Sequence, residues 1–82
     1  MVLPTEKYFF VHNGPACGDL SELMQAIKQM SDDSFYHHVT PDKNDFATWI
    51  NDCFGEHLLA RRLGRLKARA DILKTLFTRI YA

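Results

Sequence analysis

The sequence predicts a mainly α-helical protein: a compact bundle of four or five short helices with a small N-terminal β-strand or hairpin. Three observations lead to this prediction. Beyond residue 18, apolar residues recur at intervals of three and four, which is the spacing of one helix face. Polar capping residues stand where these segments begin. The chain has 82 residues, 46% of them hydrophobic, which suits a single domain, residues 1–82, with one core.

The N-terminal strand is predicted from an aromatic and β-branched run at residues 7–11. Asn13-Gly14 follows and indicates a turn, because both residue types tolerate positive φ. Residues 16–18 offer a weak return strand. Pro15 lacks an amide hydrogen and restricts such a strand to an edge or a very short length. The alternatives are a hairpin and one strand followed by a turn.

Two helices are predicted from their caps. Asp19 caps the first, and Glu22 three residues later completes an Asp variant of the capping box. The apolar face of this helix comprises Leu20, Leu23, Met24, Ile27 and Met30. Ser31 ends it and caps the second helix, at about residues 32–38, whose first-turn aspartates complement the helix dipole.

The second helix is expected to place one histidine inside. Phe35 and His38 lie at i and i+3, so they share the buried face while His37 points away. A buried histidine usually bonds a carboxylate or a carbonyl through its ring. We expect its partner at the start of the third helix, Asp45 or Asn44, so that His38 joins the two helices.

The third helix is predicted to start between Asp42 and Asp45, after Pro41, with Asp42 or Asn44 as its cap. Its apolar positions fall at i, i+3, i+4, i+7 and i+8. They are Phe46, Trp49, Ile50, Cys53 and Phe54. Gly55 stands where a glycine in the left-handed conformation ends a helix.

Residues 56–81 are helical in pattern but leave two alternatives, one helix or two. One helix would carry a heptad seam able to pair with a partner. That seam comprises Leu59, Leu63, Leu66, Ala70, Leu73, Phe77 and Ile80. Two helices would break at residues 64–67, although no Ser, Thr, Asp or Asn caps a new start there. Their faces would comprise Leu58, Leu59 and Leu63, then Ile72, Leu73, Leu76, Phe77 and Ile80. We expect two helices, because a short chain gains more core by folding its last segment back.

The predicted core draws on the apolar faces of all these segments. Its members are Tyr8, Phe10, Leu20, Leu23, Met24, Ile27, Phe35, Val39, Phe46, Trp49, Ile50, Cys53, Phe54, Leu59, Leu63, Leu73, Leu76, Phe77 and Ile80.

The centre of the chain resembles a small prokaryotic domain family of unknown function with the pattern F-x-x-H-V, N-D-F-x-x-W-I, D-x-F-G, L-A. The matching residues are Phe35, His38, Val39, Asn44, Asp45, Phe46, Trp49, Ile50, Asp52, Phe54, Gly55, Leu59 and Ala60. The resemblance runs from about Tyr8 to Ile80 and implies a module with no activity attached. After Leu66 the sequence differs from the pattern, because residues 67–70 stand in place of a polar cap and an acidic first turn. We interpret five signature residues as structural: His38, Asn44, Asp45, Trp49 and Gly55.

No motif indicates an enzyme, a metal or a cofactor. The histidines and cysteines lack zinc-ligand spacing. Cys53 lies on an apolar stripe, and Cys17 is expected nearer the surface, where pairing with His12 is the one arrangement that suggests a nucleophile. The cysteines are expected to be reduced in a cytoplasmic protein. A single Cys17–Cys53 bridge is the alternative.

Charge is divided along the chain. Residues 1–56 carry nine acids and three bases, and residues 57–82 carry seven bases and one acid, so the two parts have net charges of −6 and +6. The halves are expected to attract each other, within one molecule or between two. The alternative is an anion-binding face. Its candidate residues are Arg61, Arg62, Arg65, Lys67 and Arg69.

These observations predict a non-catalytic protein-interaction module that binds a protein partner or, as a homodimer, itself. The alternative function is nucleic-acid binding through the C-terminal basic cluster. No membrane role is expected, because no stretch approaches the roughly 18 apolar residues of a membrane span.

Overall fold

The N-terminal segment forms the predicted hairpin. In the computed structural model, which describes residues 3–82, the 3-10 turn η1 (Thr5–Lys7) leads into β1 (Phe9–Phe10). β1 pairs antiparallel with β2 (Ala16–Cys17). Asn13 takes the positive φ that the turn needs, at 57°. The return strand is therefore present, and it is as short as Pro15 requires.

The first three helices begin at the predicted caps. In α1 (Leu20–Gln29), the Asp19 carboxylate accepts the Glu22 N–H at 2.8 Å. Glu22 in turn accepts from the Gly18 N–H at 2.6 Å, one residue earlier than in a regular capping box. Ser31 caps α2 (Asp32–His38), and Asn44, one of the two predicted candidates, caps α3 (Asp45–Phe54).

The last segment forms two helices, α4 (His57–Gly64) and α5 (Arg69–Tyr81), so the two-helix alternative is confirmed. The connection covers residues 65–68, one residue later than predicted. Ala68 gives α5 no side-chain cap, as the unusual sequence of residues 67–70 indicates. The break must therefore be held by contacts from elsewhere in the chain.

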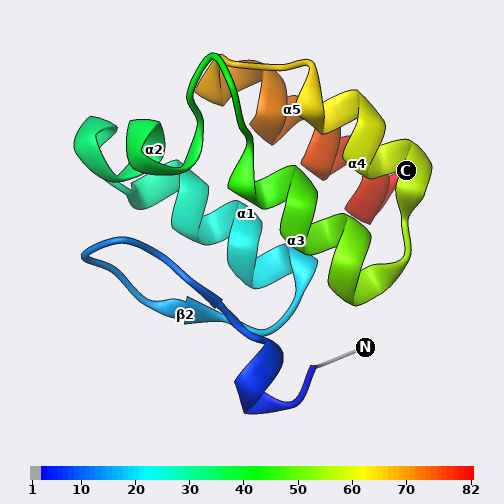
Figure 1. Ribbon diagram of the computed structural model, residues 1–82. Helices are drawn as coiled ribbons and strands as arrows, with labels where there is room; N and C mark the ends of the chain where they lie inside the picture. Colours follow the sequence, from blue (N-terminus) through cyan, green and yellow to red (C-terminus); the bar gives the residue numbers. More distant parts are fainter. Residues whose placement is uncertain (1–2) are drawn as a thin grey trace.

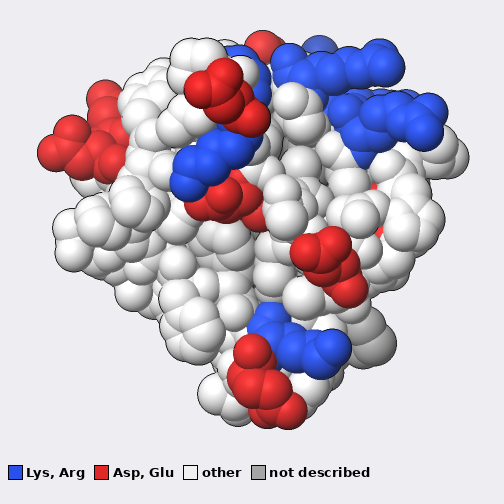
Figure 2. All heavy atoms as spheres, in the orientation of Figure 1, with Lys and Arg blue, Asp and Glu red and all other residues white. Residues whose placement is uncertain are grey.

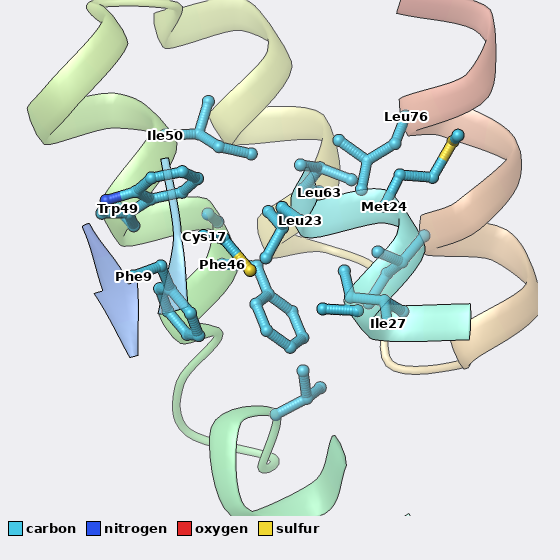
Figure 3. Close-up of a cluster of buried hydrophobic side chains, with 14 of the residues drawn as sticks. Phe9, Cys17, Leu23, Met24, Ile27, Phe46, Trp49, Ile50, Leu63 and Leu76 are labelled. Carbon is cyan, nitrogen blue, oxygen red and sulfur yellow. The ribbon is translucent and has the colours of Figure 1, made fainter. Parts of the chain in front are cut away.

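The helices pack in pairs around one core. α3 lies against α4, and α1 lies against both α5 and β2. The hairpin lies on one side of α1 and α3, and α4 and α5 lie on the other (Figure 1). Side chains from the hairpin and from α1, α3, α4 and α5 meet between these elements (Figure 3). The largest fully buried ones are Phe35, Phe46, Leu23, Ile27, Ile50, Leu63, Ile72, Leu76 and Cys17.

Two aromatic residues of the predicted core point outward instead. Phe10 is 64% exposed, and its neighbour Phe9 is buried against the rings of Phe46 and Trp49. Successive strand residues face opposite sides, and two adjacent phenylalanines give no local reason to choose between them. Phe77 is 57% exposed, so its assignment to the core is also wrong.

The way in which α4 and α5 are rotated about their own axes determines which of their apolar residues face the core. α5 turns Ile72 and Leu76 fully inward, and Phe77, about 100° further round the helix, then points to solvent. Leu58, expected on the inner face of α4, is 78% exposed. The partly buried members of the predicted core pack at its edge. They are Tyr8, Leu20, Cys53, Phe54, Leu73 and Ile80.

Gly55 ends α3 in the left-handed conformation, with φ 64°. A Cβ added there would meet no atom within 4 Å. We predict that Gly55→Ala lowers the free energy of unfolding by about 1 kcal/mol through backbone strain alone. Urea denaturation measures this loss.

Gly64→Ala is the matched control. Gly64 is helical, and an added Cβ would meet Ala47 at an ordinary 3.9 Å. This substitution should leave stability unchanged or raise it by about 0.5–1 kcal/mol. Equal losses for the two variants would refute the argument from φ.

Candidate functional site

His38 is buried and uses both ring nitrogens. Nδ1 lies 3.0 Å from Asp45 Oδ2, and Nε2 accepts the backbone N–H of His12 at 3.0 Å. Because a backbone N–H can only donate, the ring hydrogen lies on Nδ1 and points to the carboxylate. The prediction that His38 joins α2 to the start of α3 is confirmed, with Asp45 as its partner. The hairpin turn is a third segment held by the same ring.

Asp45 completes this arrangement. Its carboxylate also accepts from Lys43 Nζ at 3.1 Å. Burial raises the pKa of Asp45, but hydrogen bonds from His38 and Lys43 outweigh burial and hold that pKa below its ordinary value. An ionised carboxylate behind a histidine resembles two members of a catalytic triad. Here the Nε2 lone pair that would accept a nucleophile's proton is already bonded to a backbone amide.

The other two histidines of the region pack on the same turn. The rings of His12 and His37 stack with centroids 3.9 Å apart and an interplanar angle of 6°. Lost hydration lowers the pKa of His37, and the neighbouring His12, His38 and Lys43 lower it further. Ser34 Oγ donates to the His12 carbonyl at 2.7 Å. The histidines therefore fasten the hairpin turn to α2, with His37 on the exposed side as predicted.

Asn44 is the second buried polar tie. Its Oδ1 accepts the N–H groups of Phe46 and Ala47, which caps α3. Its Nδ2 donates to the carbonyl of Leu63, in the last turn of α4, at 2.9 Å, and to that of Leu66, in the α4–α5 connection, at 3.3 Å. One side chain thus starts α3 and holds the end of α4, which explains a helix break that has no local cap.

Trp49 anchors the N-terminal segment. Its Nε1 donates to the Lys7 carbonyl at 2.8 Å, and Cys53 Sγ lies 3.8 Å from the same oxygen. The ring also packs on Phe9 and Phe54. The five signature residues therefore occupy structural positions: three polar ties, one aromatic anchor and one helix stop.

The cysteines are both free, so the Cys17–Cys53 bridge is not formed. Cys17 was expected near the surface, but it is 1% exposed, because β2 turns it inward opposite Phe9. Burial raises the pKa of its thiol to about 11, and Glu22 and Asp19 add to the rise. The thiol is therefore protonated at neutral pH and is a weak nucleophile.

No metal centre is assembled in the described part of the chain. Among residues 3–82, no group of three or more His, Cys, Asp or Glu side chains is placed to hold a metal ion. None of the helices in that range is long and apolar enough to cross a membrane.

Four of the five predicted basic binding residues are exposed. Arg61 and Arg62 lie on α4, and Arg65 and Lys67 lie in the connection that follows. Lysine and arginine side chains gather on this side of the molecule (Figure 2). Within residues 3–82, none of the four takes part in an ion pair. We call them the α4 basic cluster.

Arg69, the fifth, is used inside the fold. Nη1 donates to the carbonyls of Ile27 and Met30 at the end of α1, and Nη2 donates to Asp32 at 2.9 Å. Its guanidinium also lies over the Phe35 ring, 5.2 Å from the centroid. It therefore joins α5 to both α1 and α2 and is separate from the α4 basic cluster.

The charged halves of the chain meet within one molecule at two places. One is Arg69 with Asp32, and the other is Arg79 with Glu56, where Nε and Oε1 lie 2.6 Å apart. These two pairs support the intramolecular alternative for two of the seven C-terminal bases.

A surface that the sequence analysis missed lies between α1 and α5. We call it the α1–α5 face, and it surrounds a groove of about 410 Å³. Its residues are Met24, Gln25, Lys28, Leu73, Lys74, Phe77 and Tyr81. A signal was present in the sequence, because six large apolar residues of α5 spread over more than one face, wider than a single core contact needs.

The fold and the hydrogen bonds of His38, Asp45 and Asn44 together define a small helical domain with an N-terminal hairpin and a hydrogen-bonded polar centre. Over residues 2–76 the chain matches DUF5752, a family of unknown function, and it belongs to that family. This membership confirms the resemblance to a domain family of unknown function. No curated protein and no solved structure matches the chain.

We predict that Asn44→Asp destabilises the protein at least as much as Asn44→Ala, by about 2 kcal/mol or more. Aspartate caps helices as well as asparagine does. It has no N–H groups for the carbonyls of Leu63 and Leu66, however, and would place a carboxylate against them. Urea denaturation compares the two variants.

The control is Asp19→Asn, the reverse exchange at the half-buried cap of α1. It should lower the free energy of unfolding by less than about 0.5 kcal/mol. If Asn44→Asp were as mild as this control, Asn44 would be a cap and not a tie between α3 and the α4–α5 connection.

Proposed function

We propose that this chain is a non-catalytic protein-interaction domain that binds a partner through the α1–α5 face. The observation that carries the proposal is a pair of exposed aromatic side chains. Phe77 is 57% and Tyr81 62% exposed, and their rings lie 4.8 Å apart. Aromatic residues are enriched at protein interfaces. They provide much of the binding energy when they stand in the centre of a contact.

The surroundings of this pair support the proposal. Leu73 is partly buried beside it, and Met24 of α1 closes the base of the groove. An aromatic pair that is already packed on itself loses little side-chain freedom when a partner covers it. The face is therefore preorganised for an apolar contact.

The state of the candidate catalytic groups favours binding over catalysis. Both ring nitrogens of His38 are bonded within the fold, and the Cys17 thiol is buried with a raised pKa. Neither group is poised as a base or a nucleophile. This supports the non-catalytic part of the proposal.

The test compares three forms of the domain: wild type, Phe77→Ser/Tyr81→Ser, and Leu58→Ser. Leu58 is 78% exposed and lies on α4, so its variant is a matched loss of exposed apolar surface elsewhere. A partner captured from cell extract is identified by mass spectrometry, purified and titrated by calorimetry. We expect the double variant to weaken binding at least about tenfold and Leu58→Ser to leave it unchanged.

All three forms should unfold at similar temperatures, because the changed side chains lie outside the core. Equal affinity of the wild type and the double variant would refute the proposed face.

Nucleic-acid binding is the second candidate, and the α4 basic cluster is the observation that favours it. Arg61, Arg62, Arg65 and Lys67 are exposed and lie outside the ion pairs formed within residues 3–82. Four such cations on one side of a small domain suit contacts to phosphates, which carry most of the affinity in nonspecific binding.

This candidate predicts retention on heparin or duplex DNA at low salt that is lost in Arg61→Ala/Arg62→Ala/Arg65→Ala. The control is Lys7→Ala/Lys28→Ala/Lys74→Ala, which removes the same charge from other surfaces and should be retained like the wild type. Binding that involves three phosphate contacts should also show a steep salt dependence that flattens in the arginine variant. Failure of the wild type to be retained at low salt would exclude this candidate.

A further inference from the structure

We propose that the α1–α5 face receives an acidic amphipathic helix from another protein. The apolar side of that helix would lie in the groove, and its carboxylates would meet Lys28 and Lys74. This inference rests on the proposed function and adds the chemical class of the partner. Three arguments support it: the shape of the groove, the charges on its walls, and the repulsion between like charges that a twofold contact between two copies would create.

The shape of the groove suits a helix. Leu73, Phe77 and Tyr81 form a row at i, i+4 and i+8 along α5. This row is about 12 Å long at 1.5 Å per residue. Met24 lies between α1 and α5 (Figure 3) and is 4% exposed, so it forms the base of the groove. A row of two helical turns beside a shallow apolar groove matches the i, i+3, i+4 and i+7 anchors of an amphipathic helix.

The charge of the walls selects acidic flanks. Lys28 on α1 and Lys74 on α5 are the only charged residues among those that line the groove. Both are exposed, and within residues 3–82 neither takes part in an ion pair. Carboxylates placed on both sides of an apolar stripe would therefore find a free ammonium group on each wall. Such complementarity sets specificity and orientation more than bulk affinity.

The same lysines argue against a second copy of this chain as the occupant. A twofold homodimer through this face would place the face against itself. Lys28 and Lys74 of both copies would then surround one apolar centre with four like charges, which is unfavourable. A partner with acidic flanks avoids this repulsion and neutralises both walls.

The experiment uses the whole domain and three fluorescent model peptides with the same helical leucine and alanine stripe. The flanking positions are all glutamate, all glutamine or all lysine. Fluorescence anisotropy should show that the glutamate peptide binds tightest and the lysine peptide weakest. Two exposed ion pairs correspond to a difference of about two- to thirtyfold between the glutamate and glutamine peptides.

Charge reversal supplies the decisive comparison. Lys28→Glu/Lys74→Glu should invert the order of the three peptides. Lys7→Glu, a charge reversal at an exposed lysine outside both candidate surfaces, should leave the order as in the wild type. Absence of glutamate-peptide binding, equal binding of the three peptides, or an unchanged order after reversal at Lys28 and Lys74 would each overturn the inference.

Two further results separate this inference from the proposed function. If the peptides bind equally and Phe77→Ser/Tyr81→Ser abolishes binding, the face binds apolar partners without charge selection, and only the inference fails. If binding persists in that double variant, the proposed function fails as well. Sedimentation at high concentration should show a monomer, and a dimer that the double variant dissociates would overturn the choice of occupant.

Discussion

Assembly of the fold depends on the buried amide side chain of Asn44. α4 and α5 are joined by a connection whose own residues provide no side-chain cap for α5. Asn44 donates to one carbonyl in the last turn of α4 and to one in that connection, while it caps α3 through its oxygen. Buried donors and acceptors cost free energy when they are unpaired. The return of the last helix is therefore linked to the start of the third.

His38 does for the hairpin what Asn44 does for the last helix. Its ring lies between the Asp45 carboxylate and the backbone of His12, 26 residues earlier. Among the described residues, no buried side-chain nitrogen or oxygen lacks a hydrogen-bond partner. A polar centre in which every group is paired favours one arrangement of the segments over its alternatives. The signature of histidine, asparagine and aspartate is thus explained by assembly of the fold.

The two proposed functions use residues that this assembly leaves at the surface. The fold takes Arg69 out of the basic cluster and places it under the α1–α2 junction. It leaves the α4 basic cluster and the α1–α5 face at the surface, on different elements. Of the two surfaces, the α1–α5 face combines aromatic side chains with a groove whose only charged lining residues are lysines. That combination makes it the stronger basis for a specific contact.

Local interactions determined most of what could be read from the sequence. Asp19, Ser31 and Asn44 cap helices through hydrogen bonds to amides two or three residues away, and Gly55 ends one by its own φ. The sequence therefore placed the starts of α1 and α2 and the end of α3, and it narrowed the cap of α3 and the partner of His38 to two candidates each. Only the tertiary structure decided that Phe9 rather than Phe10 is buried and that Phe77 faces solvent. Those choices depend on how a strand or a helix is rotated against the rest of the core, and that rotation is set by residues distant in the chain.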